Sequence, residues 1–328
     1  MKKKIFITRK IPREAFLLLK EAFDVEGNPE NKSLSSEGIT ARLEDKHGLY
    51  CFLTDIIDGD MIKAAPGLEA IANFAVGYNN IDIEAAVQRQ IIITNTPDVL
   101  TETTADLAWA LILSVARKVV CGDLFVRRAR YVDWDPFGFL GIDVHGATLG
   151  IVGFGHIGQA VAVRALGFNM NILFSDVHSM PEMFDHREKI EAAVKAGLIK
   201  HASLKEMAKK ADIITIHAPL TSQTHHLVNR EILCSMKRNA ILVNTSRGAL
   251  IDEIALIEIL KEERIFGAGL DVYEWEPEVP EELTLLKNVT ILPHVGSATR
   301  KTRLGMALLA AKNLICALSG EDPPNRVV

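Results

Sequence analysis

Three glycines near the middle of the chain constrain its fold more than any other feature. The segment L-G-I-V-G-F-G-H-I-G-Q-A places Gly153, Gly155 and Gly158 in G-x-G-x-x-G spacing. An apolar run at 148–152 predicts a strand before them, and the pattern at 157–166 predicts a helix after them. Such glycines can simply pack a helix closely on a strand. The strand–turn–helix context favours a second interpretation, in which the backbone approaches a phosphate and the helix N-terminus offers it free N–H groups.

A carboxylate follows the next predicted strand. Residues 171–175 form an apolar run that ends at Asp176, 18 residues after Gly158. In dinucleotide-binding folds an acid at such a spacing accepts hydrogen bonds from a ribose diol and repels a ribose phosphate. The sequence therefore predicts a Rossmann-type domain that binds NAD. NADP stays an alternative, because His178 and Arg187 lie close enough in sequence to offset the acid.

Short apolar runs alternate with helical patterns in two series. Helical patterns at 13–23 and 82–89 belong to the first series. Strands are expected first at 4–8, 50–53, 68–73 and 91–94, and then at 148–152, 171–175, 213–217, 240–244, 267–270 and 289–292. This alternation predicts an α/β protein with two doubly wound parallel sheets. A chain of 328 residues is long enough for two such domains.

Three further helices are expected at 101–119, 123–129 and 298–318. The segment 105–116 is apolar on nearly every side but is shorter than the ~20 residues that cross a bilayer. Such a helix is buried either centrally or in a subunit interface, and we favour the interface. The last helix could cap the second sheet or cross back to the first.

Composition excludes several functional classes. A hydrophobic fraction of 48%, a charged fraction of 24% and a net charge of −5 indicate a globular protein without a nucleic-acid footprint. Cys51, Cys121, Cys234 and Cys316 lie far apart, which predicts reduced, mostly buried thiols in the cytoplasm. The adjacent residues 225 and 226 are both histidine; we expect their side chains to diverge and predict no metal site.

Three polar residues follow predicted strands of the second series. Arg247 lies in N-T-S-R-G, Glu276 in D-V-Y-E-W-E-P and His294 in P-H-V-G-S-A-T. Taken alone, each residue has another explanation. Arg247 could form a surface ion pair, Glu276 could be a solvated acid, and His294 could be a core histidine or a metal ligand. Together at the carboxyl ends of strands they suit a 2-keto acid. A guanidinium grips its carboxylate, and an imidazole paired with a carboxylate protonates its carbonyl as hydride arrives.

These motifs, with G-F-G-H-I-G before them, resemble the D-isomer-specific 2-hydroxyacid dehydrogenase family over essentially the whole chain. The resemblance implies a Rossmann-type nucleotide domain at 101–295. This domain is inserted in a flavodoxin-like substrate domain formed by 1–100 and 296–328. It also implies that Arg247 anchors and polarises the substrate, that His294 is the acid–base, and that Glu276 is its partner.

The resemblance assigns further contacts by motif. Backbone N–H groups of Val76 and Gly77 are expected to bind the substrate carboxylate, with Leu53 nearby. Trp134 is expected to reach the neighbouring subunit's site in a homodimer formed through the nucleotide domain, or to pack on its own domain. Expected cofactor contacts are Thr104, Gly153, Phe154, Gly155, His156, Ile157, Gly158, Asp176, His217, Ala218, Pro219, Thr245, Ser246, Arg247, Asp271, His294 and Gly296.

Within the family, V-G-Y-N-N-I-D and W-D-P-F-G-F-L-G-I-D-V-H-G most resemble glyoxylate and hydroxypyruvate reductases. The expected activity is NAD-dependent reduction of one of these acids. Alternatives are a phosphoglycerate, phosphite or longer-chain 2-hydroxyacid dehydrogenase, and an NAD-sensing scaffold related to co-repressors. Asn79 replaces the usual aspartate, and His156 replaces a common arginine beside the pyrophosphate. Many such reductases use NADPH and have Arg or Ser in the D-V-H segment that starts at Asp176, which favours NAD here.

Overall fold

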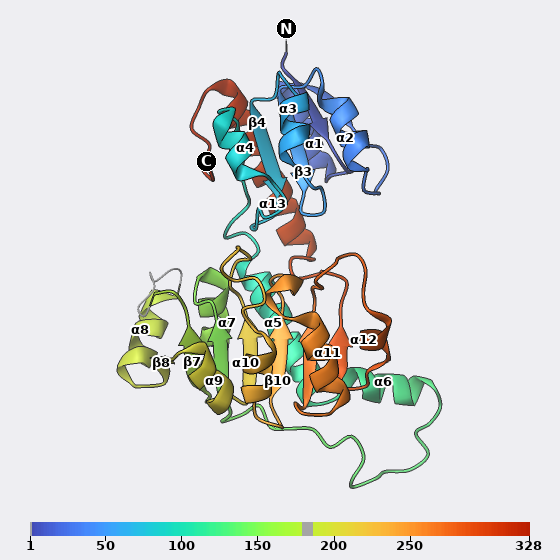
Figure 1. The fold of residues 1–328 in the computed structure, drawn as a ribbon, viewed down its shortest axis with the longest axis vertical. Helices are drawn as coiled ribbons and strands as arrows, with labels where there is room; N and C mark the ends of the chain where they lie inside the picture. The colour runs from blue at the N-terminus through green and yellow to red at the C-terminus, as the bar shows by residue number, and fades with distance from the viewer. Residues whose placement is uncertain (1, 179–185) are drawn as a thin grey trace. The chain divides into compact units, whose positions relative to one another are not determined.

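The structure is a computed structural model that describes residues 2–178 and 186–328. The chain forms two compact units (Figure 1). One comprises Met1–Leu100 and Ser297–Val328, and the other comprises Thr101–Gly296. The sequence-based division grouped Gly296 with the first unit. It belongs to the second, where its N–H donates to a carboxylate oxygen of Asp271 at 2.7 Å.

The first unit is built on a five-stranded parallel sheet with the strand order β2-β1-β3-β4-β5. This is the flavodoxin-like order, as expected. The strands are β1 (Lys4–Ile7), β2 (Asp24–Gly27), β3 (Gly48–Phe52), β4 (Ala70–Phe74) and β5 (Ile92–Thr94). The helices are α1 (Arg13–Ala22), α2 (Ser36–Leu43), α3 (Gly59–Ala64), α4 (Ile83–Gln88) and α13 (Arg300–Ser319).

The last helix, α13, belongs to the first unit, which settles the alternative that the sequence left open. It packs on β3, β4 and β5 beside α1. The Thr299 side chain caps its start by accepting from the Thr302 N–H, and Gly320 ends it at a φ of 78°. The two ends of the chain therefore complete one unit, and the second unit is an insertion between them.

The second unit is built on a seven-stranded parallel sheet with the order β12-β11-β10-β9-β6-β7-β8. Its strands are β6 (Thr148–Val152), β7 (Asn171–Ser175), β8 (Ile199–His201), β9 (Ile213–Ile216), β10 (Ile241–Asn244), β11 (Gly267–Leu270) and β12 (Val289–Ile291). Its helices are α5 (Thr101–Ala116), α6 (Val119–Arg127), α7 (His156–Leu166), α8 (Arg187–Lys195), α9 (Leu204–Lys210), α10 (Arg230–Ser235), α11 (Glu253–Lys261) and α12 (Glu281–Leu285), with a short 3₁₀ turn at Gly248–Leu250. The order changes direction between β6 and β9, which is where a doubly wound sheet binds ligands.

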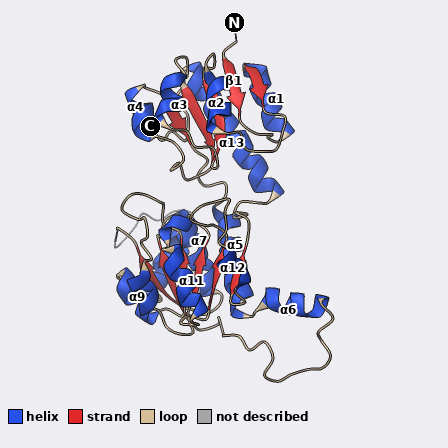
Figure 2. Cartoon of the chain, turned by 45° about the vertical axis from the view of Figure 1, so that its right-hand side comes forward, coloured by secondary structure: helices blue, strands red, loops and turns tan. Residues whose placement is uncertain are grey.

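Both faces of this sheet are buried, as the alternation along β10 shows. Ile241 and Val243 pack in the core under α5 and α7, and Leu242 packs in the core under α10 and α11. Helices cover the two faces in Figure 2. Burial on both faces explains why these strands appear in the sequence as continuous apolar runs.

Helix α5 packs centrally in its own unit, against α7 and strands β10 to β12. From its apolar surface we favoured a subunit interface for this helix. The structure instead shows the alternative, burial within its own unit. The predicted helix at 101–119 ends at Ala116, because Lys118 takes a left-handed φ of 51° before α6 begins. Helix α6 has no buried residue, and with the loop after it extends away from the sheet (Figures 1 and 2).

Two edge strands, β2 and β8, were not predicted. Their sequences D-V-E-G and I-K-H are short and mostly exposed, so they lack the apolar run that marks the central strands.

The expectation of mostly buried thiols also needs correction. Cys51 is buried, Cys121 and Cys316 are partly exposed, and Cys234 is exposed. No helix among the described residues is both long and apolar enough to span a membrane.

Candidate active site

The predicted residues of the second unit gather at one edge of its sheet. The glycine loop follows β6 and Asp176 follows β7, while the segment 217–219 follows β9. Arg247, Glu276 and His294 come after β10, β11 and β12. Because all seven strands are parallel, these loops lie at the same carboxyl-terminal edge.

His294 and Glu276 form a direct pair. The distance from His294 Nδ1 to Glu276 Oε2 is 2.7 Å, and the other carboxylate oxygen accepts from the Tyr273 N–H at 3.0 Å. Burial, the largest single influence, favours the neutral acid, but the hydrogen bond and charge of His294 and the Tyr273 N–H together lower the pKa of Glu276. The positive charge of Arg247 acts in the same direction. Glu276 is thus an anion beside the His294 ring.

Arg247 is held by the turn that follows β10. The Asn244 side chain donates to the Arg247 carbonyl at 2.8 Å and accepts from the Ser246 N–H at 3.0 Å. Burial lowers the pKa of Arg247 while the nearby Glu276 opposes that change. A guanidinium stays protonated even so. Asn244 was not among the predicted residues. The feature of the sequence that could have identified Asn244 is an amide side chain at the end of a buried strand.

Gly248 brings the loops after β10 and β11 together. A Cβ at this position would lie 1.8 Å from the carbonyl carbon of Tyr273 and 2.3 Å from the Glu274 nitrogen. Only glycine permits this approach of two backbones. The contact fixes the segment of Arg247 against the segment that carries Glu276.

Asp271 positions the segment that carries His294. Its buried carboxylate accepts from the N–H groups of Val295 and Gly296, both at 2.7 Å, and its carbonyl accepts from the His294 N–H at 2.9 Å. These bonds hold His294 at a left-handed φ of 53°. We predicted Asp271 as a cofactor contact. In the structure its carboxylate bonds are made within the protein.

The glycine loop has the geometry that a pyrophosphate requires. Gly153 has a φ of 86°, and a Cβ on Gly158 would lie 2.2 Å from the Gly153 carbonyl oxygen. Gly155 precedes α7 and would direct a Cβ into open space. The first N–H groups of α7 have no side-chain cap at Gly155, so an anion can approach them.

Two further groups fit a dinucleotide. The Thr245 hydroxyl is buried and has no hydrogen-bond partner among the described residues, which suits a polar ligand group. Asp176 accepts from the Phe154 N–H at 2.7 Å through one oxygen and from the His178 N–H at 3.1 Å through the other.

Burial lowers the pKa of His217 to about 3, so its imidazole is neutral near pH 7.

The remaining predicted residues lie in other parts of the chain. In the first unit, Asn95 donates to the Val76 carbonyl at 2.8 Å and Asn73 to the Gly77 carbonyl at 3.0 Å. Separately, the N–H groups of Val76 and Gly77 donate to no acceptor in the described part of the chain. Leu53 follows β3 and is partly exposed. Trp134 lies in the loop after α6 and is 72% exposed, so it does not pack on its own unit.

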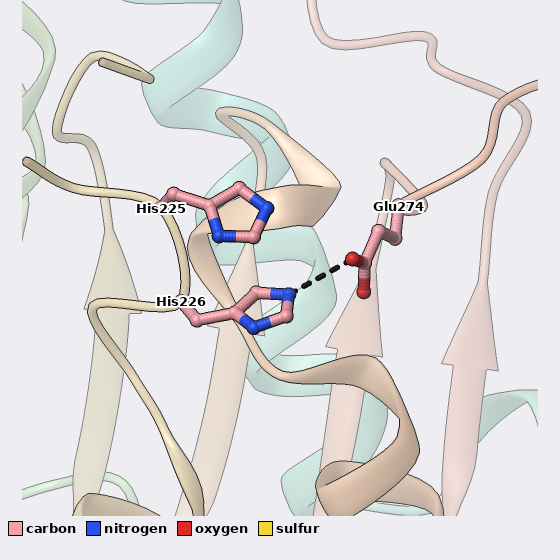
Figure 3. A group of neighbouring side chains, drawn as sticks. All are labelled: His225, His226 and Glu274. Carbon is pink, nitrogen blue, oxygen red and sulfur yellow. Dashed lines mark hydrogen bonds and ion pairs between the residues drawn. The ribbon is translucent and has the colours of Figure 1, made fainter. Parts of the chain in front are cut away.

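The histidine pair differs from our prediction. The rings of His225 and His226 do not diverge; they stack with centroids 4.0 Å apart (Figure 3). His226 has a left-handed φ of 50°, which turns its side chain toward that of its neighbour.

A cavity of about 720 Å³ lies elsewhere in this unit, at the start of β12 beside α6, and none of the predicted site residues lines it.

Comparisons with known proteins identify the family of the chain. The profile of the D-isomer specific 2-hydroxyacid dehydrogenase NAD binding domain matches residues 109–296. The chain is 47% identical to a glyoxylate reductase of Thermococcus kodakarensis over 100% of its own length and 96% of the relative's. A glyoxylate reductase of Pyrococcus horikoshii is 46% identical, again over 100% of this chain and 96% of the relative.

Solved structures show the same similarity. A protein of Thermus thermophilus is 43% identical and superposes with a TM-score of 0.88, covering 99% of this chain and 100% of its own. An NADPH-dependent glyoxylate/hydroxypyruvate reductase of Sinorhizobium meliloti, solved with NADP and malonate, is 32% identical with a TM-score of 0.86 and covers 100% of this chain and 97% of its own. The chain therefore belongs to the D-isomer specific 2-hydroxyacid dehydrogenase family, as an oxidoreductase of 2-keto and 2-hydroxy acids with an NAD-binding domain.

Proposed function

We propose that the chain is an NAD-dependent D-2-hydroxyacid dehydrogenase that reduces glyoxylate or hydroxypyruvate. The observation that carries the proposal is the His294–Glu276 pair at 2.7 Å, at the same sheet edge as Arg247 and the glycine loop. The names of the glyoxylate reductases that it resembles support the choice of substrate.

Each group has a separate task in this proposal. Arg247 binds the substrate carboxylate with its guanidinium and polarises the carbonyl. His294, held protonated by Glu276, gives its proton to the carbonyl oxygen. When bound, the nicotinamide supplies the hydride for the carbonyl carbon. From the resemblance we also propose that the N–H groups of Val76 and Gly77 bind the carboxylate, and their lack of acceptors in the described structure supports this.

The preference for NAD over NADP rests on Asp176. Its carboxylate follows β7 and is fixed by the Phe154 and His178 N–H groups. A carboxylate at this position accepts from a ribose diol and repels a 2′-phosphate. The NADP complex of the Sinorhizobium reductase shows that related enzymes can use the phosphorylated cofactor. The charge of Asp176 is the reason to expect the opposite preference here.

We further propose a homodimer formed through the nucleotide-binding unit. The arm, defined as residues 119–140, comprises α6 and the loop after it, and its large apolar side chains are exposed. They are Val119, Val120, Leu124, Val126, Tyr131, Val132, Trp134, Phe137, Phe139 and Leu140. So much exposed apolar surface on one segment is typical of a protein interface.

The four free cysteines support a reducing, cytoplasmic location.

A substrate panel tests the proposed activity. Oxidation of NADH and of NADPH is followed with glyoxylate, hydroxypyruvate, pyruvate, a longer 2-keto acid and 3-phosphohydroxypyruvate, and reduction of NAD is followed with phosphite. We expect the highest kcat/KM for glyoxylate or hydroxypyruvate with NADH. Higher kcat/KM for another substrate would overturn the substrate assignment. No turnover with any substrate, together with NADH binding, would indicate a sensor instead of an enzyme.

A further inference from the structure

A second cluster of polar side chains lies apart from the His294–Glu276 pair. His225 and His226 lie in the loop after β9, and Glu274 lies in the loop after β11. The two imidazoles stack, and the Glu274 carboxylate points toward them (Figure 3). The distance from His226 Nε2 to Glu274 Oε1 is 2.8 Å, and one donor atom of each residue lies within 4.8 Å of the other two.

These donor atoms match a transition-metal site in type, and they lie close enough to reach one ion after a change in side-chain angles. Two imidazole nitrogens and a carboxylate oxygen are a common ligand set of zinc, with a fourth position left for water. Ligand atoms about 2.1 Å from a tetrahedral zinc lie roughly 3.4 Å from one another. A cation between His226 and Glu274 would take the place of their hydrogen bond. The exposed His225 ring must turn out of its stack on His226 for its nitrogen to complete the set.

The charge balance around Glu274 favours a cation. Its side chain is only 10% exposed, and the ion-pair partner that the described structure gives it is His226 rather than a lysine or arginine. The side chain of Glu253 accepts from the Glu274 N–H at 3.2 Å, and burial together with the nearby charge of Glu274 raises the pKa of Glu253. A divalent ion would offset this concentration of acidic groups.

The backbone that carries the ligands is already fixed. The His226 N–H donates to the Ala249 carbonyl at 2.8 Å, and the His225 N–H donates to the Thr221 carbonyl at 3.0 Å. The Thr224 hydroxyl closes the same turn by donating to the Pro219 carbonyl at 2.7 Å. A metal would therefore meet two held histidine backbones, with little ordering cost on binding.

We propose that His225, His226 and Glu274 bind one zinc-class divalent ion, which joins the loops after β9 and β11. The ion has three protein ligands and an exposed position for water. The site is distinct from the His294–Glu276 pair and does not depend on the reaction assigned to the protein.

Titration of the full chain, free of an affinity tag and treated with a chelator, tests the site. Co²⁺ serves as the spectroscopic probe, and Zn²⁺ as its competitor followed by calorimetry. We expect one Co²⁺ per chain with the visible absorption of a four-coordinate ion and its displacement by one equivalent of Zn²⁺. No binding of either ion at millimolar concentration would overturn the proposal.

Three variants localise the ion. His225→Ala removes an exposed ring and Glu274→Gln removes the carboxylate charge, and each should weaken Co²⁺ binding by at least about 100-fold. His145→Gln is the matched control, because His145 is exposed and precedes β6 at the opposite edge of the same sheet. It should bind like the natural chain. Unchanged binding in both His225→Ala and Glu274→Gln, with unchanged melting temperatures, would contradict the assignment.

Discussion

Glu276 receives two hydrogen bonds, from the His294 ring and from the Tyr273 N–H, and both favour its ionised form. Its lowered pKa means that the carboxylate persists as the pH falls below the usual range of glutamate. Over the pH range in which a free histidine titrates, Glu276 is therefore an anion beside the ring to which we assign the proton.

Glu276→Gln tests the contact. The variant keeps a hydrogen-bonding side chain but loses the negative charge that lies beside the proposed proton donor. In the reductive direction, the decline of kcat/KM with rising pH should move about one unit or more toward acid. Stopped-flow pH profiles of the variant and the natural chain measure the shift. Superimposable profiles would show that the carboxylate does not act on the proton donor.

Asp176→Asn tests the cofactor preference. Asparagine retains an oxygen to accept from the Phe154 N–H, so the glycine loop should keep its shape while the negative charge is lost. The ratio of kcat/KM for NADH to that for NADPH should fall by about tenfold, equivalent to about 1.4 kcal/mol. If the ratio does not change, a group other than Asp176 discriminates between the two cofactors.

Sequence identifies reactive residue types more readily than their hydrogen-bond partners. Arg247, Glu276 and His294 were predictable because each follows an apolar strand, and parallel strands bring their carboxyl ends to one edge. The inward bonds of Asp271 and the stacking of the histidine pair were not predictable. They depend on φ values of 53° at His294 and 50° at His226, in the region that non-glycine residues seldom enter.

At the scale of elements, the site depends on the close approach of the loops after β10 and β11 at Gly248. The lengths of the strands determine where each loop begins. The contact at Gly248 determines the distance between the loops after β10 and β11. The sequence predicted the central strands from their apolar runs. It did not predict the edge strands β2 and β8, whose stability comes from pairing with β1 and β7.

Gly248→Ala should damage both stability and activity. The added Cβ would overlap the Tyr273 backbone, so the two loops must separate, at a cost of about 1–3 kcal/mol in the free energy of unfolding. Urea denaturation measures that loss, and kcat/KM for glyoxylate should fall with it. Gly27→Ala in the first unit is the control, since the nearest atom to a Cβ there, a Phe16 ring carbon, is 3.6 Å away. Equal stability of the two variants would argue against a tight contact at Gly248.

At the scale of the whole molecule, the chain is organised as an insertion. The second unit interrupts the first, and α13 returns to complete it. The family resemblance predicted this arrangement, whereas helix periodicity alone left the destination of the last helix open. The arm at 119–140 is a continuous segment of the second unit on which many large apolar side chains are exposed.

The oligomeric state tests the role of the arm. Sedimentation should give twice the chain mass of 36.1 kDa for the natural protein. Phe137→Asp should shift the equilibrium toward the monomer, because a charge replaces an apolar side chain that is 80% exposed in the single chain. Ile254→Asp changes a similarly exposed apolar residue outside the arm and should remain dimeric. A monomeric natural chain would exclude the proposed interface.

The central claim is that His294 supplies the proton, and turnover of His294→Ala tests it most directly. With glyoxylate and NADH, kcat should fall by about 10²–10⁴, whereas the dissociation constant of NADH, measured by fluorescence, should stay nearly the same. A variant that binds NADH normally and turns over at close to the natural rate would contradict the claim.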